Sequence, residues 1–185
     1  EILGQHMYRT ERLLLVAALL IASTACLEYE KKVYIFDLKN KTAELRFENI
    51  VSDSAEKADS DFMELVNDYV KGTKLETTNP KWRVSSKELL ENNGQLNGIV
   101  KFSFDSLADA GIYQHDKKSP YIFCVNKGEI VSTNAKSIDH ILKGCVALDR
   151  KGKTLEVTVK ADDVSGDEQS LAPQYALWNA SEARN

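Results

Sequence analysis

Cysteine, histidine and aspartate are the side chains of this sequence best suited to catalysis, and one of each type lies within a short stretch of the chain. His140, preceded by Asp139, lies five residues before Cys145, and Cys124 lies farther upstream. A thiolate beside a histidine base is the arrangement of a cysteine nucleophile. A disulfide between the two cysteines would consume both thiols. We therefore predict no catalytic residue in this region.

Two other polar groups have ligand-type side chains. His115-Asp116 offers one imidazole and one carboxylate, which are too few ligands for a metal, so a solvated turn is the simpler interpretation. Residues 162–168 are acidic but lack the alternating oxygen ligands and final Glu of a calcium-binding EF-hand loop. Serine-hydrolase, zinc-protease, dithiol and phosphate-loop motifs are also absent. We predict no metal site and no enzymatic activity.

Residues 7–26 have the layout of a secretory signal peptide. Arg9 and Arg12 precede an apolar run at residues 13–22, and small residues follow. A helix of that run spans roughly 15 Å, about half of a bilayer core of about 30 Å, so a permanent transmembrane helix is not expected. Residues 1–6 precede Met7 and are interpreted as upstream or non-native residues.

The ending Ser23-Thr24-Ala25-Cys26 resembles the lipobox of bacterial lipoprotein precursors. The resemblance covers residues 7–26 and implies cleavage between Ala25 and Cys26. It also implies a diacylglyceryl thioether and an N-acyl chain such as palmitate on Cys26, with no other cofactor. Ser23 stands where that family usually has an aliphatic residue. The alternative is an ordinary secretory signal cleaved near Ala25, with Cys26 an incidental thiol.

The lipoprotein resemblance implies a location. At about 0.8 kcal/mol per buried methylene, two or three long acyl chains hold a protein on a membrane permanently. Leu27 follows the cysteine, whereas an Asp there favours inner-membrane retention in enterobacterial lipoproteins. We therefore expect a protein of the cell envelope, on the outer membrane rather than the inner one, facing the periplasm or the cell surface.

Composition limits the domain count and the partners. Roughly 160 residues follow the signal region, which is enough for one domain with a core. The net charge of −4 argues against nucleic acid as a partner, because phosphate binding needs a basic face. The expected partners are the membrane, through the lipid anchor, and an envelope protein.

Cysteine parity suggests a disulfide. With Cys26 assigned to lipid, Cys124 and Cys145 remain as a pair in an exported chain. A bridge closing a loop of about 20 residues would contribute roughly 3 kcal/mol of stability. The alternative is two buried free thiols.

Hydrophobic periodicity predicts strands at eight places. Asn93-Gly94 is a strong hairpin signal, and we also expect hairpins at 39–42 and 126–128. One apolar stripe predicts a helix over residues 55–70, a helical turn is expected at 106–111, and residues 136–143 suit a short helix or a loop. The expected strands are 33–38, 43–50, 82–90, 96–104, 121–125, 129–132, 145–148 and 155–160.

These elements predict an α+β fold: a largely antiparallel sheet of about six to eight strands in hairpins, with one main amphipathic helix packed on one face. The expected organisation is a signal region at 1–25, the lipidated cysteine with a short tether at 26–32, and a single domain at 33–160. Residues 161–185 read as a polar, mobile tail. Tyr175 and Trp178 in that tail are candidates for docking on the domain or on a partner.

Three functions remain open. The leading hypothesis is a non-enzymatic, membrane-anchored envelope lipoprotein that acts as a binding or structural module. An alternative is a carrier of a lipid or other hydrophobic ligand in a cleft between helix and sheet, which a large pocket between Phe62, Trp82 and Phe102 would favour. A second alternative is a hydrolase with an unrecognised site.

Overall fold

The structure is a computed structural model that describes residues 27–162 and 168–184. The predicted signal peptide, the cleavage site at Ala25 and the lipidation site at Cys26 lie outside the described residues, as does most of the acidic segment 162–168.

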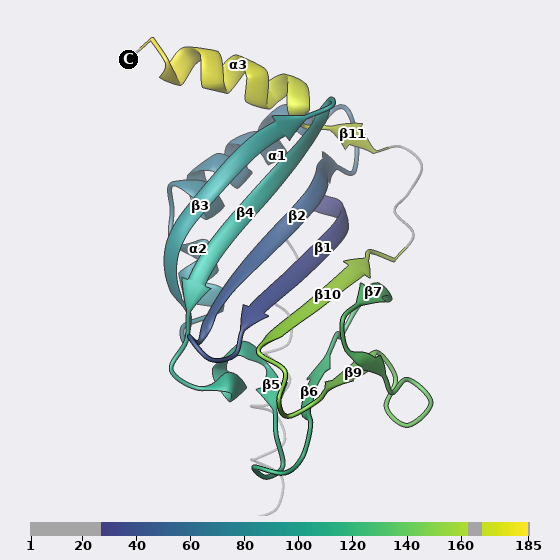
Figure 1. Ribbon diagram of the computed structural model, residues 1–185. Helices are drawn as coiled ribbons and strands as arrows, with labels where there is room; N and C mark the ends of the chain where they lie inside the picture. Colours follow the sequence, from purple (N-terminus) through teal and green to yellow (C-terminus); the bar gives the residue numbers. More distant parts are fainter. Residues whose placement is uncertain (1–26, 163–167, 185) are drawn as a thin grey trace, which may run out of the picture.

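A seven-stranded antiparallel sheet, sheet A, is the main element of the fold (Figure 1). At its centre lies the hairpin of β1 (Leu27–Asp37) and β2 (Thr42–Ser52). A second hairpin, β3 (Arg83–Asn92) and β4 (Gln95–Ser103), turns at Asn93-Gly94 as predicted and pairs with β2. The strand order is β3-β4-β2-β1-β10-β7, and β11 (Gln169–Ser170) adds a short segment to the end of β2.

A smaller antiparallel sheet, sheet B, packs near the lower end of sheet A in Figure 1. Its order is β5 (Ile112–Tyr113), β6 (Tyr121–Cys124), β9 (Cys145–Leu148) and β8 (Lys136–Ser137). The expected hairpin across residues 126–128 is wrong. β6 pairs with β9, whereas β7 (Glu129–Thr133) pairs with β10 (Thr154–Lys160) in sheet A. Local alternation marks a strand but does not select its partner.

The helix predicted over residues 55–70 is two segments, α1 (Ala58–Glu64) and the π-helical η1 (Leu65–Val70). Its apolar stripe is buried, with Phe62 and Val66 at 3% and 1% exposure. Asp61, also buried, accepts a hydrogen bond from the Ser52 hydroxyl and ties α1 to β2. The expected single main helix is not shown, because α2 (Lys74–Thr78) and α3 (Ala172–Glu182) also cover the domain. The helical turn predicted near 106–111 is the 3₁₀ helix η2 (Leu107–Ala110).

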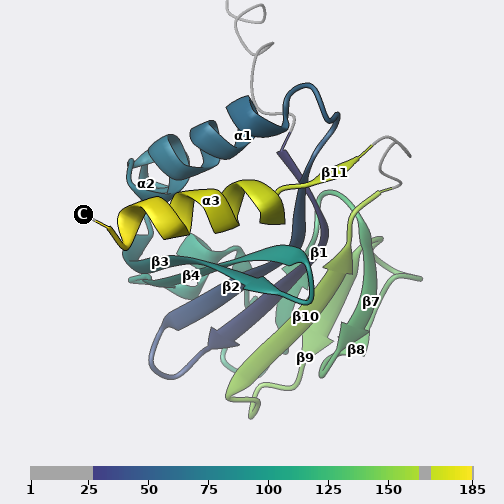
Figure 2. The same cartoon turned by 90° about the horizontal axis from the view of Figure 1, so that it is seen from above.

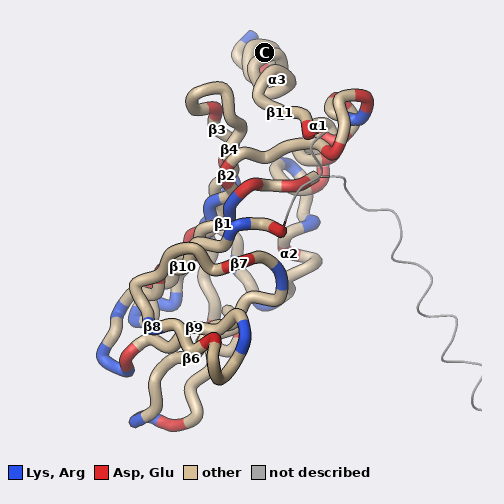
Figure 3. Tube along the Cα trace, turned by 90° about the vertical axis from the view of Figure 1, so that its right-hand side faces the viewer, with Lys and Arg blue, Asp and Glu red and all other residues tan. Residues whose placement is uncertain are grey.

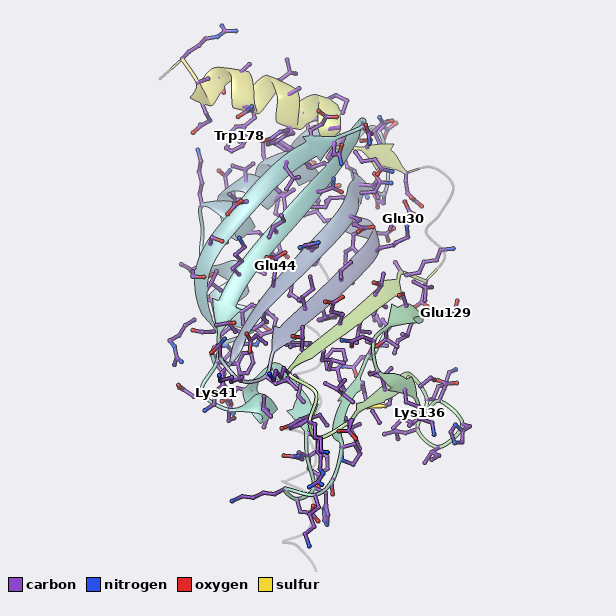
Figure 4. All side chains as sticks on the ribbon, in the orientation of Figure 1. Glu30, Lys41, Glu44, Glu129, Lys136 and Trp178 are labelled. Atoms are coloured by element: carbon purple, nitrogen blue, oxygen red, sulfur yellow. A yellow bond between two sulfur atoms is a disulfide. The ribbon has the colours of Figure 1, made fainter. Side chains whose placement is uncertain are left out.

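One face of sheet A is buried under two different covers. Near one end it packs against sheet B around Phe36, Leu45 and Phe102. Near the other end it packs against α1, η1 and α3 around Ile50 and Leu96. Phe47 contacts both clusters. Residues of the opposite face, such as Glu44 and its partner Arg46, remain accessible to solvent (Figure 4), which agrees with the expected one-sided sheet.

Two boundaries differ from the sequence prediction. The expected tether at residues 27–32 is the first half of β1, because Leu27 already pairs with Ser52. The expected mobile tail contains β11 and α3, which runs beside α1 and across the ends of β3 and β4 (Figure 2). Trp178 lies edge-on to Phe62, and the Tyr175 hydroxyl donates a hydrogen bond to the carbonyl of Leu89. A few apolar residues suffice to dock a segment whose composition is mostly polar.

The junction of β11 and α3 is predicted to be essential for stability. Leu171 is fully buried, so Leu171→Ala should lower the free energy of unfolding by about 2–4 kcal/mol. Leu177 on the same helix is 76% exposed, and Leu177→Ala should change it by less than about 0.5 kcal/mol. Urea unfolding of both variants gives the comparison, and equal effects would contradict the docking of α3.

The predicted disulfide is confirmed: Cys124 and Cys145 are bonded and face each other across β6 and β9. The bond closes a loop with a sequence separation of 21. Its reduction should therefore lower the free energy of unfolding by roughly 3 kcal/mol in the chain-entropy model. Urea unfolding with and without reductant measures this, and a Cys124→Ala/Cys145→Ala variant should be insensitive to reductant.

Candidate ligand-binding cleft

An apolar cleft of about 190 Å³ lies between the helical layer and the buried face of sheet A. The sheet contributes residues of β1 to β4, and the helical layer contributes η1 and α2. Most of the lining is aliphatic or aromatic, and its charged residues are Glu28, Lys87 and Glu88. The apolar side chains include Leu27, Tyr29, Phe47, Ile50, Leu65, Tyr69, Val70, Leu75, Leu89 and Val100. Its volume is comparable to that of an apolar cavity of about 150 Å³ that binds benzene.

Two local features of the strands leave this space open. Gly98 of β4 lines the cleft with no side chain, and a Cβ added there would lie 3.2 Å from Ile50 Cδ1. Asn49 of β2 has a positive φ of 53°, and the β1–β2 register has no pair at this residue. This irregularity lets Phe47 and Ile50, three residues apart, both line the cleft.

Lys87, a lining residue of the cleft, belongs to a partly exposed ion pair. The Lys87 ammonium donates hydrogen bonds to the Gly72 carbonyl at 2.6 Å and to the Glu76 carboxylate, whose Oε1 lies 2.7 Å from it. The bond from Lys87 lowers the pKa of Glu76. Because Lys87 is already neutralised, it adds a satisfied polar group to the lining rather than a free charge.

A second lysine beside the cleft has a different environment. Lys32 projects from β1 among three aromatic rings, with its Nζ 4.9 Å from the ring centre of Tyr34, 5.1 Å from Phe47 and 5.9 Å from Tyr29. Among residues 27–162 and 168–184, no residue accepts a hydrogen bond from this ammonium, and no carboxylate pairs with it. We refer to Lys32, Tyr29, Tyr34 and Phe47 as the lysine cage.

Burial determines the protonation behaviour of the lysine cage. Desolvation lowers the pKa of Lys32 to about 8 and raises the pKa of Tyr29 above its ordinary value. The pKa of Tyr34 rises to about 12, first because of burial and then because of the nearby Tyr29. The aromatic rings oppose part of this lowering of the Lys32 pKa, since they attract the charged ammonium.

The structure separates most of the residues that the sequence singled out. Trp82 stacks on Phe102 at 4.0 Å within the cluster under sheet B, whereas Phe62 lies in the helical cluster, so these three residues do not line one common pocket. The cleft lies elsewhere on the same face of sheet A. Asp139 accepts a hydrogen bond from the Gly144 N–H, and the disulfide uses both thiols that could have paired with His140.

The other polar groups behave as turns in the described residues. Asp116 accepts hydrogen bonds from the N–H groups of Lys118 and Ser119, which lower its pKa, and the Tyr113 hydroxyl lies 3.2 Å from His115 Nδ1. No group of three or more His, Cys, Asp or Glu within the described part of the chain is arranged to hold a metal ion.

Sequence reasoning missed Lys32 and Gly98. The charge of residues 27–32 favours a tether, and Gly98 falls within the strand predicted at 96–104 without any local sign of a cleft. The available signal was a lysine in line with Tyr34 and Phe36, which alternate along one face of β1.

Comparison with known proteins identifies no relative: neither a protein-family model, nor a curated protein, nor a solved structure matches the chain. In the described residues, no helix has the length and apolar character needed to cross a membrane.

The lysine cage should make stability depend on pH in a defined direction. The folded-state pKa of Lys32 is about 8, below the 10.5 of an exposed lysine, so the unfolded chain binds more protons between these values. The cost of charging Lys32 is fully present below pH 8 and disappears as the pH rises toward 10.5. Lys32→Met should therefore raise the free energy of unfolding at pH 7 by about 1–3 kcal/mol, and this gain should shrink by pH 9.5.

Urea unfolding of the wild type and of Lys32→Met at pH 7, 8 and 9.5 tests this. At each pH the free energies of unfolding of the two proteins are subtracted, so the contributions of the other titrating groups cancel. Lys101 is exposed on the same sheet, where its nearest carboxylate is 3.9 Å away. Lys101→Met is the matched control and should show no such pH-dependent difference. A constant difference for Lys32→Met would contradict the desolvated amine.

Proposed function

We propose that this protein is a membrane-anchored, non-enzymatic binding module of the cell envelope that holds an apolar group of its ligand in the cleft. The cleft itself is the observation that carries the proposal: an apolar recess with a few polar groups is the usual form of a small-ligand site. Its volume of about 190 Å³ is below the roughly 300–1,000 Å³ of sites that enclose a whole drug-sized ligand. The ligand therefore inserts one apolar segment and leaves the rest outside.

The position of the cleft along the chain agrees with anchoring at Cys26. Leu27, the next residue, lines the cleft and belongs to β1. A diacylglyceryl group on Cys26 would place the membrane one residue from the cleft, so the proposed module would take up its ligand at the membrane surface. The proposed location remains the outer membrane, facing the periplasm or the cell surface, with Leu27 rather than Asp after the cysteine as its support.

Anchoring can be tested through the cysteine. In the bacterial host, Cys26→Ala should release the protein from the membrane fraction and remove the mass of the acyl chains from its N-terminal peptide, because the thioether has no other attachment site. Fractionation followed by mass spectrometry measures both. Membrane attachment and an N-terminal mass unaffected by the substitution would exclude a lipid anchor at Cys26.

The cleft can be tested by filling it. Gly98→Val should place two methyl groups in the cleft and weaken binding of an uncharged apolar probe, 1-decanol, at least tenfold, because the probe and the new side chain compete for the same space. Ser103→Val introduces the same residue on the other face of β4 and should leave binding unchanged. Calorimetric titration gives the affinities, and equal affinities of the two variants would refute ligand binding in the cleft.

A further inference from the structure

The lysine cage lies where the two covers of sheet A meet. Tyr34 packs against the cluster under sheet B, and Phe47 belongs to both clusters. Lys32, between them, is partly buried, and it lacks the carboxylate that normally accompanies a desolvated ammonium. Lys87, a few strands away on the same face, does have such a partner in Glu76.

The polar groups of the lysine cage are hydrogen-bond donors. An ammonium offers three donors and no acceptor, and each tyrosine hydroxyl adds a donor. Both tyrosine rings face the ammonium, with their centres 5.9 Å (Tyr29) and 4.9 Å (Tyr34) from Lys32 Nζ. Neither hydroxyl has a recorded hydrogen bond to another described residue. A group with several acceptor oxygens and a negative charge complements this arrangement.

The lysine cage and the cleft share a wall. Tyr29 and Phe47 line the cleft, and their ring centres lie 5.9 Å and 5.1 Å from Lys32 Nζ. Their own rings also meet edge to face at 5.4 Å. A ligand whose charged end reaches Lys32 can therefore extend an apolar chain past these rings into the cleft.

We propose that the ligand is a fatty acid, whose carboxylate pairs with Lys32 beside Tyr29 and Tyr34 while part of its alkyl chain fills the cleft. The identity of the ligand rests on the proposed binding function of the cleft. A single chain fits the small volume better than a lipid with two chains, and the remainder of the chain extends out of the cleft.

The surrounding charges direct the carboxylate to Lys32. Desolvation, and after it the charges of Glu28 and Glu30 of β1, raise the pKa of Glu168, so these three carboxylates form an acidic group beside the start of the strand. Figure 3 shows acidic segments where β1 and β2 approach α1. Glu28 also lines the cleft, so the carboxylate of a bound anion would have to point away from Glu28 and toward Lys32, while Lys87 already has Glu76 as its partner. Lys32 is then the one unpaired cation next to the cleft among the described residues.

The test compares two ligands that differ only in their polar end, decanoate and 1-decanol, in calorimetric titrations at pH 7. Decanoate is kept below its critical micelle concentration and decanol below its solubility limit. Wild-type protein should bind decanoate about ten- to a hundredfold more tightly than decanol, as expected for a charge-assisted hydrogen bond in a desolvated site. Lys32→Met should abolish that preference and leave decanol binding unchanged. Lys101→Met, on the opposite face of the sheet, should behave as wild type.

The outcomes separate the two proposals. If decanol and decanoate both fail to bind wild-type protein, the binding function of the cleft is wrong. If decanol binds but decanoate has no advantage, or if Lys32→Met keeps the advantage, only the fatty-acid assignment is overturned. Tighter binding of decyl phosphate than of decanoate would likewise overturn the assignment of the ligand's charged group as a carboxylate. Tyr34→Phe removes one hydrogen-bond donor without changing the charge, so it should weaken the binding of decanoate several-fold and leave the binding of decanol unchanged. This variant gives an independent check if Lys32→Met folds poorly.

Discussion

Burial of one face of the central β1–β2 hairpin is the constraint on which the rest of the structure depends. Each strand has 11 residues, and at about 3.3 Å per residue the hairpin is roughly 36 Å long. A single helix packed across the strands is about 10 Å wide and cannot cover that length. The chain meets the constraint with two covers, sheet B at one end and the helices at the other, and Phe47 packs against both.

The candidate site follows from the imperfect junction of these covers. Where they meet, Lys32 fills the gap with a long side chain whose stem packs against the rings of its neighbours. Farther toward the helices, Gly98 and the irregular backbone at Asn49 leave an apolar recess. A partly buried ammonium without a carboxylate lowers stability, and an empty cleft forfeits packing contacts. Both features are costs that a protein retains most readily where they serve binding.

How much could be predicted depended on whether the signal was local. The Asn93-Gly94 turn, the paired strands around it and the stripe containing Phe62 and Val66 were correct, because turn chemistry and periodicity act within a few residues. The disulfide followed from cysteine parity once Cys26 was assigned elsewhere. The pairing of β6 with β9 was missed, because several strands have similar alternation and only the complete core selects among them. Tyr175 and Trp178 were named as candidates for docking, but the helix α3 that carries them was not predicted, since its contacts are few and distant in sequence.

The amino-acid sequence by itself determined where most strands and the main helical segment lie, because these depend on alternation and turns within short stretches. Cysteine parity favoured the Cys124–Cys145 bond over two free thiols, and the structure decided between them. Only the tertiary structure decided that residues 27–32 belong to the sheet, that Gly98 and Asn49 open a cleft, and that Lys32 is enclosed by three rings. These features arise where residues 29–34 meet Phe47 and where β4 meets the helices, so they depend on burial between distant segments. The environment of a single lysine is set by packing, and packing has no signature in a local pattern.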